Sequence, residues 1–93
     1  MATRTATMLF LDAGGTPIGV VNAQADVFYF NTSGQRVWVL PSNYAMTPTP
    51  NVTGRYSVSF EWPLGASTVY ATMYGTDPAT ELPIVKEQTL LVR

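Results

Sequence analysis

The sequence predicts an all-β chain, an antiparallel β-sandwich of about six to seven strands, with a small barrel as the alternative. Apolar and polar residues alternate over short runs, as they do in strands with one buried face. Gly, Pro, Asn and Asp separate these runs at turn-like intervals. No segment keeps the helical period of about 3.6 residues, and Thr, Val and aromatic residues stand where helices favour Ala, Glu, Lys and Leu. We expect one domain over residues 1–93 and no helix longer than about two turns.

The first half of the chain predicts two strands joined by glycines, followed by a hairpin. A strand over Thr3–Leu11 ends at Asp12–Gly15, whose two glycines permit the positive φ angles of a tight reversal. A short strand over Pro17–Asn22 follows. The runs Ala25–Phe30 and Gln35–Leu40 flank an Asn-Thr-Ser-Gly turn, and they therefore predict a hairpin.

The predicted strand Ala25–Phe30 carries large side chains on both faces. Val27 and Tyr29 share one face, and Phe28 and Phe30 share the other. A strand of this kind is either covered on both sides or lies beside another chain.

The second half predicts another hairpin, formed by Arg55–Trp62 and Ser67–Tyr74, and a last strand over Ile84–Val92. The face with the larger apolar area is expected to pack inward, at about 1.5 to 3 kcal/mol for each large side chain. The predicted core residues of the hairpin are Tyr56, Val58, Phe60, Trp62, Val69, Ala71 and Met73. Tyr70 and Tyr74 then point outward, either as cross-strand fillers or as part of a binding face.

Charged residues are scarce. They make up 12% of the chain, against roughly 25% in soluble domains generally. Thirteen threonines fill polar positions, Lys86 is the only lysine, and the net charge is −1. Few charges are left to block strand edges, so we expect a homo-oligomer or a subunit of an assembly, with a small Thr-rich secreted domain as the alternative. The basic residues are scattered singly, which argues against nucleic-acid binding.

The residue types needed for most catalytic sites are missing from the sequence. The chain has no histidine and no cysteine, which excludes triad hydrolases and zinc sites that use these ligands. The carboxylates are dispersed, and Asp77 in GTDPATE suits a turn better than a calcium loop. We therefore expect no enzyme activity, no cofactor and no metal.

The apolar run Met8–Leu11 is too short for a signal peptide, and the uncharged stretch 37–54 holds three prolines, which excludes a membrane span. We expect a chain that is made in the cytoplasm, is left soluble and has no membrane partner.

Two stretches resemble a known class of domain. LDAGGTPIGVV, residues 11–21, is similar to the opening of small immunoglobulin-like and prealbumin-like sandwiches, and GRYSVSF resembles their "G-x-Y" entry to a later core strand, here Gly54 and Tyr56. The core cysteines of antibody domains are absent, and the connection over residues 41–54 is long. Such domains recur as accessory proteins on the capsids and tails of tailed bacteriophages, whose Thr-rich, charge-poor composition this chain resembles.

This resemblance implies a noncatalytic structural protein of the virion, a decoration or tail-associated subunit that binds other virion proteins. The alternative is a carbohydrate-binding or adhesion module that stacks sugars on Trp38, Tyr70 and Tyr74. An enzyme that uses scattered carboxylates is a third, weaker alternative.

The segment Pro41–Thr53 is the predicted main contact arm. Connections longer than about 12 residues are uncommon in compact domains and are usually functional or disordered, and this segment is not composed like a disordered linker. Pro48 and Pro50 stiffen the segment, and Tyr44 and Met46 supply apolar anchors. Alternatively, the segment only crosses between sheets, with Tyr44 and Met46 over the core. The candidate protein-interaction residues are therefore Tyr44, Met46, Tyr70 and Tyr74.

Overall fold

The computed structural model describes the backbone of residues 3–90 and the side chains of residues 3–85. This part of the chain is all-β and contains no helix. Its strands are β1 (Thr3–Leu9), β2 (Val21–Phe30), β3 (Arg36–Trp38), β4 (Tyr44–Ala45), β5 (Thr47–Pro48), β6 (Arg55–Glu61), β7 (Val69–Thr76) and β8 (Pro83–Leu90). The predicted absence of a long helix is confirmed for these residues.

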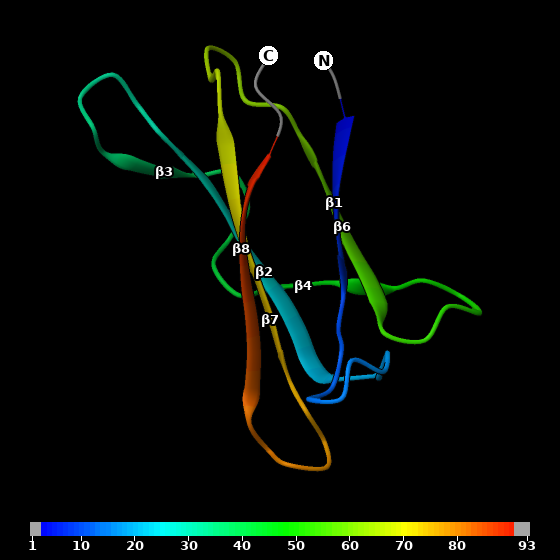
Figure 1. Ribbon diagram of the computed structural model, residues 1–93. Helices are drawn as coiled ribbons and strands as arrows, with labels where there is room; N and C mark the ends of the chain where they lie inside the picture. The colour runs from blue at the N-terminus through cyan, green and yellow to red at the C-terminus, as the bar shows by residue number, and fades with distance from the viewer. Residues whose placement is uncertain (1–2, 91–93) are drawn as a thin grey trace.

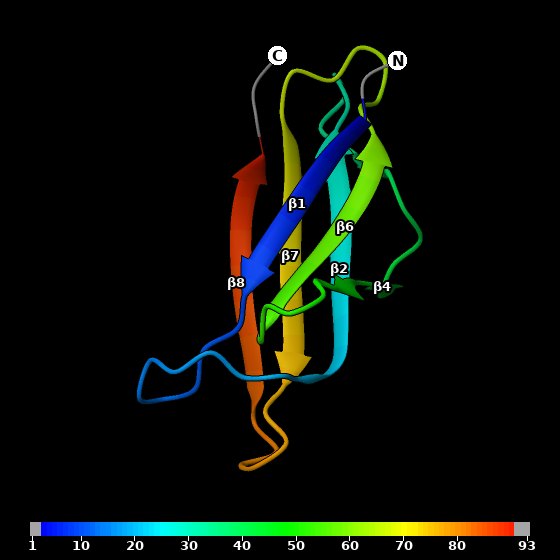
Figure 2. The same cartoon turned by 90° about the vertical axis from the view of Figure 1, so that its right-hand side faces the viewer.

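The strands form two antiparallel sheets that face each other in a sandwich-like arrangement (Figure 1). One sheet has three strands in the order β1-β6-β5. The other has five strands, in the order β3-β2-β7-β8, with β4 also paired to β2. Figure 2 shows β1 and β6 crossing obliquely in front of β2, β7 and β8.

The core lies between the two sheets and follows the predicted alternation. In β7 every second residue is buried, from Val69 to Gly75. The buried hydrophobic residues are Ala6, Met8, Phe10, Ala23, Ala25, Val27, Met46, Val58, Phe60, Trp62, Ala66, Val69, Ala71 and Met73. The inward placement of the predicted core residues is therefore confirmed, with Tyr56 partly buried against this core.

The connection from β1 to β2 is fixed by Tyr56 on β6. The Val20 N–H donates to the Tyr56 hydroxyl at 3.1 Å, and the Tyr56 ring packs edge-on against Phe10 at 5.4 Å between centroids. The predicted strand over Pro17–Asn22 is wrong, because Pro17 forms only an isolated bridge with Leu11 and β2 begins at Val21.

Two antiparallel strand pairs were predicted as hairpins, and only one forms. β2 pairs with β3 across the turn at residues 31–35, which confirms the first. The second is wrong, because β6 and β7 belong to different sheets. The intervening residues 62–68 cross between the sheets, with the Trp62 indole N–H donating to the Ala66 carbonyl at 2.8 Å inside the core.

The segment Pro41–Thr53 also crosses between the sheets. β4 pairs with β2 in one sheet, and β5 pairs with β6 in the other. Met46, the residue between them, is buried in the core. The last predicted strand corresponds to β8, and residues 91–92 of that prediction lie outside the described part of the chain.

Candidate functional site

Aromatic side chains gather on the outer face of the five-stranded sheet. The inner face of β2 holds the buried Ala25 and Val27, so the alternation turns Phe28 to the opposite, outer face. The strand register then places Phe28 opposite both Trp38 on β3 and Tyr70 on β7. Together with Phe30, these residues form a group that we call the aromatic cluster, defined as Phe28, Phe30, Trp38 and Tyr70.

The rings of the aromatic cluster are in direct contact, with Phe28 at the centre. Its centroid lies 5.8 Å from that of Phe30, 5.8 Å from that of Trp38 and 5.9 Å from that of Tyr70. The Phe28 and Tyr70 rings are stacked at 22°, whereas the two other pairs meet edge-on. Such pairs contribute about 0.5 to 1.5 kcal/mol each beyond area burial, so the cluster holds its own shape.

Arg36 on β3 adds a positive charge to this surface. Its guanidinium carbon lies 4.6 Å from the centroid of Phe28 and 5.6 Å from that of Trp38, which is cation–π geometry. Phe30 and Trp38 nevertheless keep 49% and 43% of their surface exposed. Exposed apolar residues that lie together mark interaction sites more often than residues that lie singly, and Trp, Tyr and Arg are the types that dominate binding surfaces.

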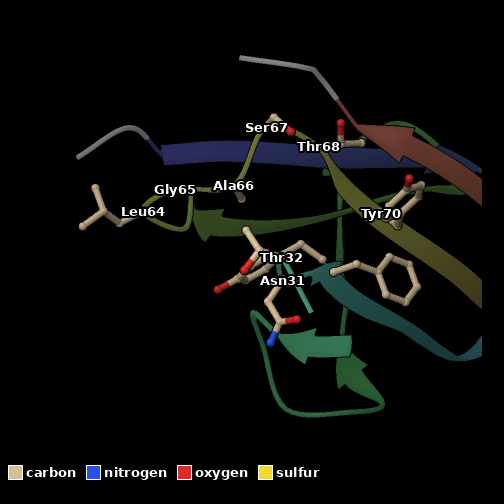
Figure 3. A pocket seen from close by; sticks show the side chains of 10 residues that line it. Asn31, Thr32, Leu64, Gly65, Ala66, Ser67, Thr68 and Tyr70 are labelled. Atoms are coloured by element: carbon tan, nitrogen blue, oxygen red, sulfur yellow. The ribbon is translucent and has the colours of Figure 1, made fainter. Parts of the chain in front are cut away.

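A hollow borders the aromatic cluster at the end of the sheet. Figure 3 shows it between the turn after β2, at Asn31 and Thr32, and the connection from β6 to β7, with Tyr70 at one side. The turn is rigid, because the Asn31 side-chain oxygen accepts the backbone N–H groups of Ser33 and Gln35 at 2.9 Å. Leu64, also on its rim, is 93% exposed.

Tyr74 lies on the same face as Tyr70 but belongs to a polar network. Its hydroxyl donates to the side-chain oxygen of Asn43 and lies 3.4 Å from the Asp26 carboxylate. The backbone N–H of Asn43 donates to the same carboxylate at 2.8 Å. Burial, the negative charge of Asp26 and the hydrogen bond to it raise the pKa of the Tyr74 phenol above its usual 10.0. The network ties the turn before β4 to the sheet.

Replacing Tyr74 with phenylalanine should lower stability by about 1 kcal/mol at neutral pH, because one hydrogen-bonded hydroxyl is lost. Because the pKa of Tyr74 is raised in the folded state, its contribution is complete below pH 10.0 and is lost as the pH rises through the higher folded value. Urea unfolding across this pH range should therefore show a smaller alkaline loss for Tyr74→Phe than for the wild type. Equal losses in wild type and Tyr74→Phe would contradict this account.

The structure brings the predicted interaction residues together only in part. Tyr70 belongs to the aromatic cluster, and Tyr74 to the neighbouring polar network. Tyr44, two fifths exposed, follows Asn43 directly and is available for contact. Met46 is 7% exposed, so its side chain packs in the core, as the sheet-crossing alternative expects.

Phe28, Phe30 and Arg36 are site residues that the sequence alone does not single out. A signal was present, because Ala25–Phe30 carries large residues on both faces. Nothing in the sequence could show that Trp38 and Tyr70 flank Phe28, since that depends on the pairing of β2 with both β3 and β7. Of the row proposed for sugar stacking, Trp38 and Tyr70 share the cluster, and Tyr74 does not.

Residues 3–90 contain no helix long and apolar enough to cross a bilayer. Among the side chains of residues 3–85, no three or more His, Cys, Asp or Glu residues are grouped closely enough to hold a metal ion. No known protein family, curated protein or solved structure matches this chain. Its function is therefore inferred from its own residues, and the aromatic cluster is the most distinctive group on its surface.

Proposed function

We propose that this chain is a noncatalytic binding subunit that attaches to a protein surface through the aromatic cluster. The observation that carries this proposal is that Phe30 and Trp38 both pack against Phe28 and both stay about half exposed, with Arg36 beside Trp38. The cluster and its surroundings offer ring surfaces, apolar contact and one guanidinium. Protein-binding surfaces use the same groups, because their cores are rich in aromatic residues and arginine.

The strand pairing supports an immunoglobulin-like type of sandwich. An immunoglobulin sandwich has strands A-B-E-D in one sheet and C′-C-F-G in the other. The order β1-β6-β5 corresponds to B-E-D, and β3-β2-β7-β8 corresponds to C′-C-F-G. In this reading the aromatic cluster lies on the outer face of strands C′, C and F. In an immunoglobulin sandwich, strand A pairs with the outer side of strand B, which corresponds to β1. No strand within residues 3–90 pairs with that side of β1.

The packing within the aromatic cluster favours a protein partner over a sugar. Sugar stacking needs an open ring face. Here Arg36 lies over Trp38, and one face of Tyr70 is stacked on Phe28. A carbohydrate-binding or adhesion module remains the second candidate, since Trp38 and Tyr70 do lie on one exposed surface.

We further propose that the bound surface is that of a bacteriophage particle, with this chain a capsid-decoration or tail-accessory subunit made in the host cytoplasm. The low charge, the many threonines and the resemblance of residues 11–21 to such domains support this placement. A nearly neutral surface tolerates close neighbours, as dense assembly on a particle requires.

Replacing Phe30 and Trp38 together with serine should abolish attachment to the particle. Hot-spot residues each contribute about 2 kcal/mol or more, which corresponds to roughly a thirtyfold change in the dissociation constant. The fold should survive, because both side chains are about half exposed. The measurement is co-sedimentation with purified capsids and, separately, with purified tails of the phage that encodes the chain, together with the melting temperature.

Leu82→Ser is the matched control, since Leu82 is 63% exposed and is not part of the cluster. It should bind as the wild type does. Binding of the wild type to neither capsids nor tails, together with glycan-array binding that Tyr70→Ala abolishes, would replace the virion proposal with the carbohydrate one. Particle binding that the double serine variant retains would remove the aromatic cluster from the interface.

A further inference from the structure

The outer edge of β1 presents a row of backbone groups that have no partner among residues 3–90. β1 is an edge strand, paired with β6 on one side only. The Phe10 N–H donates to the Gly54 carbonyl at 2.8 Å, so even-numbered residues direct their N–H and C=O groups to β6. By the alternation of an antiparallel pair, Thr3, Thr5, Thr7 and Leu9 direct theirs outward.

The other free edges in residues 3–90 carry features that hinder further pairing. β4 and β5 are two residues each, β5 contains Pro48, and β3 is three residues. β8 begins at Pro83 and contains Lys86 and Glu87 in its sequence. Short length, proline and charge are the means by which natural sheets protect their edges.

β1 has none of these protections. It spans seven residues in unbroken register with β6, without proline and with Arg4 as its one charged residue. Arg4 does not guard the edge, because its guanidinium lies over the Trp62 ring at 5.5 Å from the centroid. A long and regular edge with few charges is a ready template for another strand.

We propose that two copies of this chain pair antiparallel through β1, joining their three-stranded sheets into one continuous sheet. In one register, every outward N–H and C=O group of β1 pairs with an outward group of the second copy. This register places Ala6 opposite Ala6 of the second copy. Thr5 then faces Thr7 of the second copy, and Thr3 faces Leu9. Opposed threonines are favourable cross-strand pairs, and a net charge of −1 leaves little repulsion between copies.

The strand is self-complementary in this register, and for that reason the second copy is the occupant rather than an unrelated strand. When two identical strands are related by a twofold axis, the same outward backbone groups are paired in each copy. No outward group of β1 is left for a third copy, so the assembly ends at a dimer. The dimer does not depend on what the aromatic cluster binds, since that cluster lies on the other sheet.

A charge-exchange experiment tests both the edge and the register. Thr5 and Thr7 are exposed, so lysine or glutamate at either site should leave the fold intact. Thr5→Lys with Thr7→Lys sets like charges opposite each other in both pairs of the twofold interface and should raise the dissociation constant roughly two- to thirtyfold. Thr5→Lys with Thr7→Glu sets opposite charges there and should keep the dimer. Sedimentation velocity over a concentration series measures each equilibrium.

A backbone experiment gives an independent check. Thr5→Pro removes an outward N–H of β1 without removing a bond to β6, and should yield a folded monomer. Val85→Pro is the control, because the Asp77 N–H bond to the Leu82 carbonyl implies that Val85 directs its N–H to the outer edge of β8. That variant should remain dimeric. Circular dichroism confirms that both are folded.

A wild type that stays monomeric at its highest soluble concentration would overturn the proposal. So would a dimer that the double-lysine variant retains undiminished, or one that Trp38→Ser abolishes and the β1 variants do not, since its interface would then be the aromatic cluster. If the variant Phe30→Ser with Trp38→Ser loses particle binding but still forms the β1 dimer, the result bears on the proposed function and not on the dimer.

Discussion

Replacing Gly54 with alanine is expected to lower the free energy of unfolding by about 3 to 5 kcal/mol, which is much of the 5 to 15 kcal/mol typical of whole domains. Gly54 has a φ of 84°, a conformation that costs other residues about 1 to 2 kcal/mol. An added Cβ would lie 2.8 Å from the Phe10 carbonyl oxygen and 2.9 Å from that of Ile18. The Phe10 carbonyl already accepts the Ile18 N–H at 3.0 Å, so relief of the clash must separate hydrogen-bonded backbone.

Gly65→Ala provides a control that isolates the steric part of this effect. Gly65 has the same φ of 84°, but an added Cβ meets nothing within 4 Å. Its substitution should therefore cost only the conformational part, about 1 to 2 kcal/mol. Urea unfolding of both variants gives the comparison, and equal losses would show that the contacts at Gly54 do not determine its stability.

Replacing Phe60 with alanine is expected to cost about 3 to 5 kcal/mol, from lost apolar burial and from the cavity that remains. Phe60 is 4% exposed, and its ring lies 6.5 Å from that of Trp62 between centroids. Trp62 is held by its bond to the Ala66 carbonyl, so it cannot easily move to fill the space. The measurement is the urea midpoint and slope, with the near-ultraviolet dichroism of the aromatic residues, Trp62 among them, as a report on packing.

The same substitution at Phe30 is the control. Phe30 keeps 49% of its surface exposed on the outer face, so Phe30→Ala removes an equal side chain without opening a cavity. Its expected cost is about 1 kcal/mol, chiefly from its contacts with Phe28 and Tyr70. If Phe30→Ala were as costly as Phe60→Ala, the stability of the domain would depend on the aromatic cluster as much as on the core.

The inward and outward faces of β6 and β7 could be predicted from the sequence because strand alternation is a local property. Phe60 and Met73 are buried as their patterns indicate, whereas Tyr70 lies on the outer face. The sheet to which each strand belongs is a nonlocal property. The run 62–68 looks like a turn, yet the burial of Trp62 and Ala66 carries the chain from one sheet to the other.

The candidate site was only partly predictable for a related reason. Tyr70 was singled out as an outward aromatic residue, but its importance depends on Phe28, which reaches it only through the pairing of β2 with β7. Met46 looked like a surface anchor because its neighbours are polar and proline-rich. Its burial follows from the passage between β4 and β5, which takes this single residue through the space between the sheets.

The pairing of β1 with β6 sets the order in which strands can pair during synthesis. Residues 3–9 are made before their partner, residues 55–61. At ribosomal rates of about 5 to 20 residues per second, roughly 3 to 10 s separate the two strands. The hairpin of β2 and β3 closes early through its short turn, whereas the three-stranded sheet must wait for a long-range encounter that slows folding. During that interval β1 is part of the nascent chain without its native partner.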